Sequence, residues 1–341
     1  MEVNRRMDKP KPIKQQIAES FVFMNEDQQR LQLQSAIRGS MRLRSHTDKG
    51  HKDVIYYEEE QDYIVDYDQG WIARTEGSRI PNWSKHPLCG IKQFDHNLYP
   101  DYSNREYTVF GDYDCEMTDI EASNERAAEG KDRLMNVKKK LASGQKVTYV
   151  VYGDSISEGG EASEERYSYF SRFSAQLTSL YPDGSLEIVN KAIGGETSEG
   201  GAERVNEDVV ACLPDLVTIG YGMNDQNQFE YGNTVSLKQY EQNIRFIIET
   251  IQSSSDATIV LVTPCQPNPL WQHTSGRIGE YAEVLRRLGD IYQIAVADAY
   301  SIWQQALIAG KTPECLLLNN INHPNDYGHY LYYKAFERII C

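Results

Sequence analysis

The stretch KVTYVVYGDSISE, residues 146–158, decides the expected fold. Its β-branched and aromatic first half stops at a Gly-Asp-Ser turn, and the sequence from Glu164 onward has a helical pattern. This order predicts a strand, a tight turn and a helix. Ligands of open α/β sheets bind outside the carboxyl ends of the strands, so the hydroxyl of Ser155 lies where chemistry usually takes place. We therefore expect Ser155 to be a nucleophile, with Asp154 beside it, although these residue types more often cap helices in such turns.

The composition narrows the class of partner. The chain has 341 residues and a formal net charge of −15, which would repel nucleic acid and anionic membranes and favours a neutral substrate. Its six cysteines are scattered without a CxxC pair or a Cys/His cluster, so we expect free thiols and no zinc site. The polar amino terminus lacks the apolar segment of a signal peptide, and no apolar run reaches the length of a membrane span. These features predict a cytoplasmic protein.

Residues 1–40 are expected to form an N-terminal arm. Ile17, Phe21 and Met24 recur at helical spacing after two prolines that break the start of the chain. This pattern predicts a short amphipathic helix. The arm would either dock on another domain or a second subunit, or remain solvated.

Residues 41–119 are expected to form a small β-rich accessory module. The segment is rich in Trp and Tyr and is interrupted by Gly and Pro, and short alternating runs near residues 63–65 and 71–73 predict strands joined by turns. The aromatic rings either fill a thin core, which is the interpretation we favour, or form a stacking platform for sugar faces.

Residues 120–341 show strands and helices in alternation. Helix formers fill residues 120–143, so the domain boundary is expected near Asp119. Alternation over two hundred residues predicts a parallel sheet covered on both faces. The expected strands are residues 186–189, 216–219, 259–262 and 294–297, and the expected helices are residues 202–212, 237–251 and 278–292.

Glycine and polar residues follow the expected strands. Gly195 lies in a Gly-Gly pair, Asn224 follows the next strand, and His323 precedes a proline near the carboxyl terminus. Each has an ordinary explanation on its own, as a turn glycine, an Asx turn and a surface histidine. Because the loops after parallel strands meet at one edge, we expect these residues to lie near Ser155. Together they would supply a nucleophile, a base and oxyanion donors, which are the groups needed for acyl transfer.

These residues carry a resemblance to a known superfamily. The blocks Gly153-Asp154-Ser155, Asn190 with Gly195, Gly222-Met223-Asn224-Asp225 and His323-Pro324 resemble, in order and spacing, those of the SGNH hydrolases, also called GDSL-type esterases and lipases. The resemblance implies a three-layer α/β/α fold, flavodoxin-like, with a central and mostly parallel sheet. It also implies hydrolysis of carboxylic esters, with Ser155 as nucleophile and His323 as general base. The oxyanion would be held by the N–H groups of Ser155 and Gly195 and by the side-chain amide of Asn224.

Two positions depart from the family pattern. Ala192 stands where the family usually has glycine, which matters little if the backbone φ there is negative. Asn320 stands where the family has an aspartate three residues before the catalytic histidine, so the usual acidic member is missing. Asn320 could accept a hydrogen bond from His323 Nδ1 and orient the ring, but it brings no negative charge. The alternative is that Asn320 caps the loop and that a carboxylate from elsewhere, such as Asp326, is the partner.

The resemblance implies a serine esterase that forms an acyl-enzyme on Ser155 and needs neither a metal nor an organic cofactor. An accessory module before an SGNH-like domain is similar to the arrangement in bacterial carbohydrate esterases, so short acyl groups on sugars, acetyl above all, are the expected substrate. The alternatives are a general short-chain esterase, thioesterase or lipase, and a binding protein on a decayed esterase scaffold. We expect a small-molecule or oligosaccharide ester as partner, with no nucleic acid and no membrane, and leave a homo-oligomer open.

Overall fold

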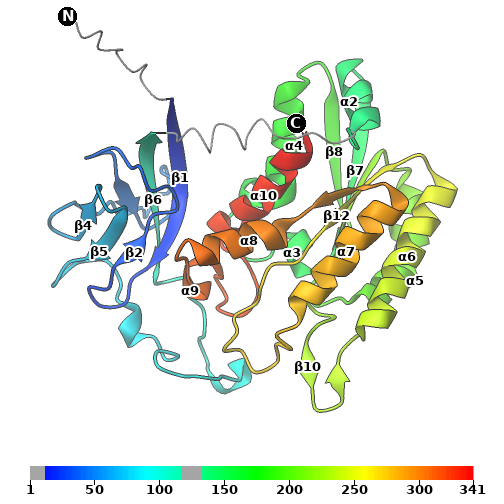
Figure 1. Ribbon diagram of the computed structural model, residues 1–341. Coiled ribbons are helices and arrows are strands. Elements are labelled where there is room, and N and C mark those ends of the chain that lie inside the picture. The colour runs from blue at the N-terminus through cyan, green and yellow to red at the C-terminus, as the bar shows by residue number, and fades with distance from the viewer. Residues whose placement is uncertain (1–11, 117–131, 341) are drawn as a thin grey trace, which may run out of the picture.

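A five-stranded parallel sheet forms the centre of the larger part of the molecule. The computed structural model describes residues 12–116 and 132–340, and Figure 1 shows this sheet beside a smaller part that contains the first strand. The strand order is β13-β12-β9-β7-β8, and every pairing in it is parallel. The strands are β7 (Lys146–Gly153), β8 (Ser185–Asn190), β9 (Leu216–Gly220), β12 (Thr258–Val262) and β13 (Ala295–Ala297). They match the strands that the sequence predicts, so the parallel sheet is confirmed.

Helices cover both faces of this sheet. Alternate residues of β7 point to opposite faces, so that Tyr149 and Val151 pack in one buried cluster while Val150 and Tyr152 pack in the other. The first cluster includes side chains of α2 (Met135–Ala142), α4 (Tyr169–Leu180), α8 (Ala299–Ile308) and α10 (Asp326–Ile340). The second includes side chains of α5 (Ser198–Asp208), α6 (Leu237–Ser254) and α7 (Ile278–Tyr292). The predicted three-layer α/β/α architecture is therefore confirmed.

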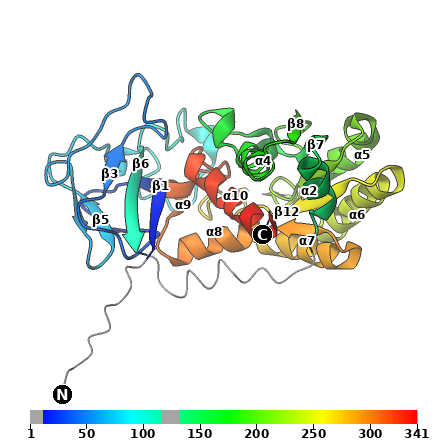
Figure 2. The same ribbon diagram turned by 90° about the horizontal axis from the view of Figure 1, so that it is seen from above.

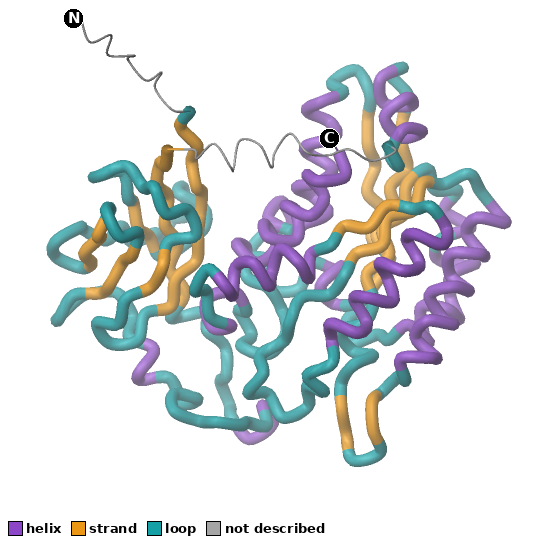
Figure 3. Tube along the Cα trace, viewed as in Figure 1, coloured by secondary structure: helices purple, strands orange, loops and turns teal. Residues whose placement is uncertain are grey.

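The smaller part is built from two antiparallel sheets with a core of their own (Figure 3). One sheet has the order β1-β6-β3 and the other β2-β5-β4. Tyr57, Tyr63, Tyr67 and Tyr113 are buried in the core between them, so the interpretation that the tyrosines fill a thin core is confirmed for these residues. The strands are β1 (Ile13–Val22), β2 (Gln29–Arg30), β3 (Arg42–Arg44), β4 (Tyr63–Asp66), β5 (Trp71–Arg74) and β6 (Thr108–Glu116).

The helix expected in the N-terminal arm is wrong. Residues 13–22 form strand β1, which pairs along its length with β6 and has an irregularity between Gln16 and Glu19. The apolar residues at helical spacing are overridden by this long-range pairing, which satisfies the backbone groups of β1 and buries Phe21 in the small core. The domain boundary expected near Asp119 lies outside the described residues, and the domain limits stay a prediction.

Short elements complete the described chain. Among the residues that the structure describes, no helix is both long and apolar enough to span a bilayer. The short elements are α3 (Ser155–Glu158), α9 (Pro313–Leu316), the hairpin strands β10 (Gln228–Phe229) and β11 (Gly232–Asn233), and the 3-10 helices η1 (Trp83–Lys85), η2 (His96–Leu98), η3 (Glu165–Tyr167) and η4 (Val210–Cys212).

A buried ion pair joins the two parts, which lie side by side in Figure 2. Lys311 Nζ, just after α8, lies 2.5 Å from Glu19 Oε1 of β1, and both side chains are almost completely buried. The other carboxylate oxygen of Glu19 accepts a hydrogen bond from Tyr113 Oη at 2.5 Å, and Lys311 also donates to Ser20 O at 2.9 Å. Every charge in this contact has a partner, so removing one would leave the other buried and uncompensated.

We predict that Lys311→Met lowers the free energy of unfolding by about 3–5 kcal/mol, because it leaves the carboxylate of Glu19 buried without its cation. Urea denaturation measures the change. The matched control is Lys146→Met, which breaks the ion pair with Glu187, whose two side chains are 59% and 53% exposed, and should cost less than about 1 kcal/mol. Equal losses in the two variants would show that the buried pair does not stabilise the contact between the parts.

Candidate active site

Ser155 lies in the turn that follows the central strand β7. Asp154 caps the short helix α3, and its Oδ1 accepts a hydrogen bond from the N–H of Ile156 at 3.0 Å. Glycine is required at position 153, because a Cβ there would lie 2.3 Å from Gly220 O of the neighbouring strand β9. The predicted strand and tight turn are confirmed. The short α3 follows the turn at once, and the helix expected from Glu164 begins later, as α4 at Tyr169. The turn places the Ser155 hydroxyl at the carboxyl end of the sheet.

The Ser155 hydroxyl meets His323. Ser155 Oγ and His323 Nε2 are 2.8 Å apart, although the two residues are separated by 168 positions. When the hydroxyl donates, Nε2 is the acceptor and Nδ1 carries the ring hydrogen. The structure thus brings the candidate nucleophile and the candidate base within hydrogen-bonding distance.

The side chain of Asn320 does not orient His323. Asn320 Oδ1 accepts a hydrogen bond from Asn268 Nδ2 at 3.0 Å, and the only hydrogen bond of the His323 ring within the described chain is the one to Ser155. The expected bond from His323 Nδ1 to Asn320 is therefore wrong. Its physical reason is local: Asn320 has a φ of 56°, in the left-handed region that Asn tolerates, and its amide oxygen closes the loop onto Asn268.

The alternative partner, Asp326, is also engaged elsewhere. Its carboxylate accepts hydrogen bonds from Ser163 N at 2.7 Å and from Ser163 Oγ at 2.6 Å. Over residues 12–116 and 132–340, His323 therefore has no carboxylate hydrogen-bonded to its ring. Burial lowers the pKa of His323 to about 4, with no acidic neighbour to raise it. The ring is neutral at physiological pH and available to accept a proton.

Hydrogen bonds within the α/β part hold the backbone of the loop that carries His323. Asn319 Oδ1 accepts from three successive N–H groups, those of residues 321, 322 and 323, at 3.0, 2.9 and 2.9 Å. Leu318 N donates to His323 O at 2.9 Å. Asn268 N donates to Ile321 O at 2.7 Å. The asparagine-rich sequence therefore satisfies its own backbone groups and fixes the turn that places the imidazole.

The β-rich part holds the same loop from the other side. Asn104 N donates to Leu318 O at 2.7 Å, and Asn104 Nδ2 donates to Leu317 O at 2.9 Å. Ser103 Oγ adds a third bond, to Leu318 O at 3.1 Å. The completely buried Asn104 is itself oriented by Trp83 Nε1, which donates to its Oδ1 at 2.8 Å. We call Trp83, Ser103 and Asn104 the loop clamp.

Two oxyanion candidates lie beside Ser155. A Cβ on Gly194 would be 3.9 Å from Ser155 Cβ, which places the Gly194-Gly195 turn against the serine. Gly195 has a φ of 76°, a conformation that glycine adopts at no steric cost. Asn224 Nδ2 donates to Glu196 O at 2.9 Å, which ties the amide to this turn and leaves its second N–H for a ligand.

The other motif residues near these donors have structural roles. Ala192 is not among the residues with positive φ, so replacing the family's glycine brings no backbone strain. Asn190 Nδ2 donates to Ser157 O at 3.1 Å and so connects the turn to α3. Burial raises the pKa of Asp154 to about 7, and the structure shows this residue as a helix cap with no hydrogen bond to His323.

The sequence interpretation missed Gly160, Asn104 and Asn268. A Cβ on Gly160 would lie only 2.8 Å from Ser155 O, so glycine is needed for this close packing against the nucleophile turn, and the same position lies 3.5 Å from His323 Nδ1. Its signal was present as the Gly159-Gly160 pair just after the nucleophile turn. Asn104 and Asn268 had none, because their contacts with the His323 loop depend on tertiary structure.

Other candidate sites lie apart from the Ser155–His323 pair. A cavity of about 690 Å³ lies between the two parts, but neither Ser155 nor His323 lines it. Asp95, His96 and His273 form a group that could hold a metal ion. The hydrogen-bonded serine and histidine, with a glycine turn and a free amide N–H beside them, are suited to acyl transfer.

A family model places this geometry in a known group. The model of the GDSL-like lipase/acylhydrolase family matches residues 151–331, which is more than half of the chain and includes Ser155, Gly195, Asn224 and His323. The chain belongs to this family. GDSL-like acylhydrolases hydrolyse carboxylic esters, so the superfamily and the enzyme class that the sequence resemblance implied are both confirmed.

Several known proteins are similar to this chain. An acetylxylan esterase from Geobacillus stearothermophilus is 28% identical over 217 residues, which cover 59% of this chain and 96% of that esterase. The uncharacterized lipoprotein YqeF from Bacillus subtilis (strain 168) is 29% identical over 101 residues, or 29% of this chain and 41% of the lipoprotein. A solved structure of the Geobacillus acetylxylan esterase has a TM-score of 0.49 at 26% identity, covering 59% of this chain and 96% of that one. An α/β hydrolase from the metagenome of Lake Arreo has a TM-score of 0.47 at 24% identity, covering 56% and 93%.

We predict that kcat/KM for a small ester stays level as the pH falls toward 5 and declines only through an apparent pKa of about 4. The reason is that His323 accepts the Ser155 proton only when neutral, and its burial without a carboxylate keeps it neutral to low pH. A pH–rate profile measures the limb. Recovery of full activity after return to pH 7 controls for acid unfolding, and a reversible acid limb near 6.5 would contradict the assignment.

We predict that Asn104→Ala lowers kcat by about tenfold to a hundredfold, because small displacements of a catalytic group are costly. The loss of its side-chain bonds lets Leu317 and the His323 loop shift. Ser103→Ala is the matched control: Leu318 O keeps its bond from Asn104 N, so the effect should be smaller. Steady-state kinetics with a small ester separates kcat from KM. An equal fall in both variants, or a change in KM alone, would contradict a positioning role.

Proposed function

We propose that this acylhydrolase is a serine esterase that removes short acyl groups, acetyl in particular, from carbohydrate. The observation that carries the proposal is the 2.8 Å hydrogen bond between Ser155 Oγ and His323 Nε2 at the carboxyl edge of the sheet. That pair can form and hydrolyse an acyl-enzyme with no further group in the proton path.

The proposed reaction has two half-reactions. His323 Nε2 takes the proton of Ser155 Oγ as the oxygen attacks the ester carbonyl, and the imidazolium then protonates the departing alcohol oxygen. The N–H groups of Ser155 and Gly195 and the second N–H of Asn224 would stabilise the oxyanion, which is typically worth about 2.7–4 kcal/mol per donor. Water, deprotonated by the same histidine, releases the acid and restores the serine.

Similarity supports a sugar ester as the substrate. The relative that matches over 96% of its length is named an acetylxylan esterase. The net charge of −15 favours a neutral polymer or oligosaccharide over an anionic one. A cytoplasmic location stays part of the proposal, and the free thiols of Cys89, Cys115, Cys212, Cys265 and Cys315 support a reducing compartment. A cytoplasmic enzyme would act on imported, soluble oligosaccharides.

A second candidate is a binding protein on the same scaffold. The observation that favours it is the His323 ring without a hydrogen-bonded carboxylate in the described chain. A fluorophosphonate probe separates the two, because it reacts only with an activated serine. Stoichiometric labelling of Ser155 supports the esterase, and no labelling under conditions where the protein binds acetylated sugars supports the binding protein.

We predict that Ser155→Ala lowers the rate of acetyl ester hydrolysis by about 10⁴-fold or more while the thermal midpoint changes little. Release of acetate from acetylated xylooligosaccharides measures it, with nitrophenyl esters of rising chain length for comparison. Ser163→Ala is the control, since its hydroxyl bonds Asp326 rather than His323. Retained turnover in Ser155→Ala would refute the nucleophile, and faster turnover of octanoyl than acetyl esters would refute the acyl preference.

A further inference from the structure

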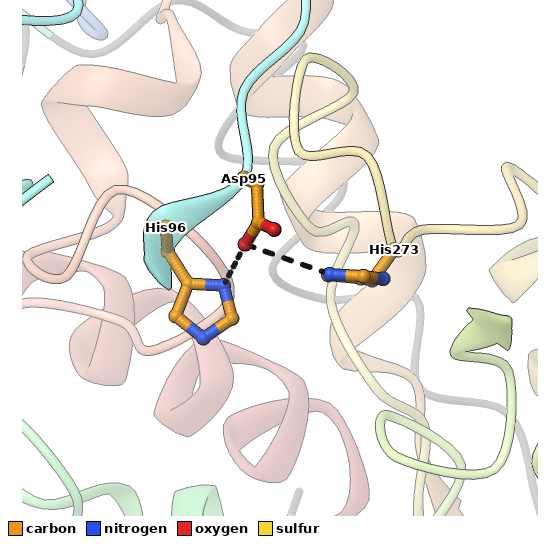
Figure 4. Close-up of side chains that lie close together, drawn as sticks. All are labelled: Asp95, His96 and His273. Carbon is orange, nitrogen blue, oxygen red and sulfur yellow. Dashed lines mark ion pairs between the residues drawn. The ribbon is translucent and has the colours of Figure 1, made fainter. Parts of the chain in front are cut away.

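Three metal-ligating side chains meet where the β-rich part touches the α/β part (Figure 4). Asp95 and His96 lie at the start of η2, and His273 lies in the segment between β12 and α7. Asp95 Oδ1 is 3.7 Å from both His96 Nδ1 and His273 Nε2. We propose that these three residues bind a divalent transition-metal ion of the zinc class. The proposal does not rest on the esterase chemistry.

The donor set suits such an ion. Two imidazole nitrogens and one carboxylate are ligands that zinc and its neighbours in the first transition row accept, whereas calcium and magnesium prefer oxygen alone. In a tetrahedral zinc site with bonds of about 2.0–2.2 Å, neighbouring ligand atoms are about 3.4 Å apart. One ligand atom from each of the three residues already lies within 4.8 Å of the others. The two 3.7 Å separations exceed the tetrahedral spacing by a few tenths of an ångström, and the third, between the two imidazole nitrogens, exceeds it by at most about 1.4 Å.

The two imidazole nitrogens nearest to Asp95 carry no hydrogen. Trp271 Nε1 donates to His96 Nδ1 at 3.1 Å, and because an indole nitrogen can only donate, that imidazole nitrogen is unprotonated. Gln272 Nε2 lies 3.2 Å from His273 Nε2, a contact in which the imidazole nitrogen accepts. Each of the two nitrogens therefore has a lone pair that a neutral N–H now occupies and that a cation would take over beside the Asp95 carboxylate. The ion would take the place of the Trp271 N–H at His96 Nδ1.

The backbone holds the ligands in place before any ion arrives. Phe94 N donates to Leu270 O at 2.9 Å, and Gln272 N donates to Phe94 O at 3.0 Å, so the segments that carry the ligands are paired. Asp95 Oδ1 also accepts from Asn97 N at 3.0 Å, which fixes the carboxylate. The side chains are 23%, 28% and 20% exposed for Asp95, His96 and His273, so the site is open to an ion from solvent and to a water as fourth ligand. A bound ion would add a further connection between the two parts, besides the Lys311–Glu19 pair and the loop clamp.

Isothermal titration of the tag-free full chain with Zn²⁺ tests the proposal. We expect one ion per chain with a Kd below about 10 µM, and a rise in the thermal midpoint with added Zn²⁺ because the ion binds the folded state. Asp95→Asn, which keeps the size of the side chain, and His273→Ala should each weaken binding by at least about tenfold and abolish the rise.

The matched control is His46→Ala. His46 and His51 stack with ring centroids 4.0 Å apart elsewhere on the β-rich part, so this variant removes an accessible histidine outside the proposed site. Binding should be unchanged in it. Equal affinity in the wild type and in both ligand variants, or loss of binding in His46→Ala, would overturn the proposal. Thermal midpoints without metal show that the variants fold, so that a weaker Kd reports on the ligands.

Discussion

The position of His323 beside Ser155 depends on the loop that carries it, because no carboxylate from residues 12–116 or 132–340 bonds the imidazole. In a triad, an aspartate fixes both the orientation of the ring and its tautomer. Here the ring is placed by the backbone that carries it, and that backbone is held by Asn319 from within the loop, by Asn268 from a neighbouring segment and by Asn104 from the β-rich part. The contacts of Asn268 and Asn104 are buried and that of Asn319 is partly buried, so shifting the loop would leave polar groups unsatisfied.

This arrangement changes the free energy of protonating His323, the proposed base. With a pKa of about 4 in place of 6.5, protonating His323 costs about 3 kcal/mol more than protonating a histidine in water. The positive charge that would form on the imidazole in the transition state needs a negative charge that forms in the same step. In the proposed reaction the oxyanion would do so, because it would form beside the buried imidazolium. A base that is poor in the resting enzyme is therefore compatible with catalysis if the oxyanion is well held.

The sequence predicted the parallel sheet because its signals are local. Residues 278–292 have an apolar stripe at helical spacing, and α7 has those bounds. The run at the start of residues 146–158 is β-branched and aromatic, and it forms the central strand. Long-range interactions account for the errors. Apolar residues recur at helical spacing from residue 17 onward, but residues 13–22 form a strand that pairs with β6. No pattern within that segment predicts this pairing. The Ser155–His323 pairing followed from a family pattern, whereas the contacts of Asn104 and Asn320 depend on which carbonyl and amide groups the tertiary fold brings near them.

The β-rich part supplies some of the hydrogen bonds that hold the His323 loop. The match to the acetylxylan esterase takes in 96% of that protein but 59% of this chain, and the family model begins at residue 151, so Trp83, Ser103 and Asn104 lie outside the shared family region. Ser103 and Asn104 nevertheless bond the carbonyl groups of Leu318 and Leu317, five to six residues before His323, and Trp83 bonds the side chain of Asn104. The loop that carries His323 is held by hydrogen bonds to its backbone groups. Some of the donors in these bonds belong to the β-rich part. The buried Lys311–Glu19 pair joins the same two parts, so it supports the contact across which Ser103 and Asn104 hold the His323 loop.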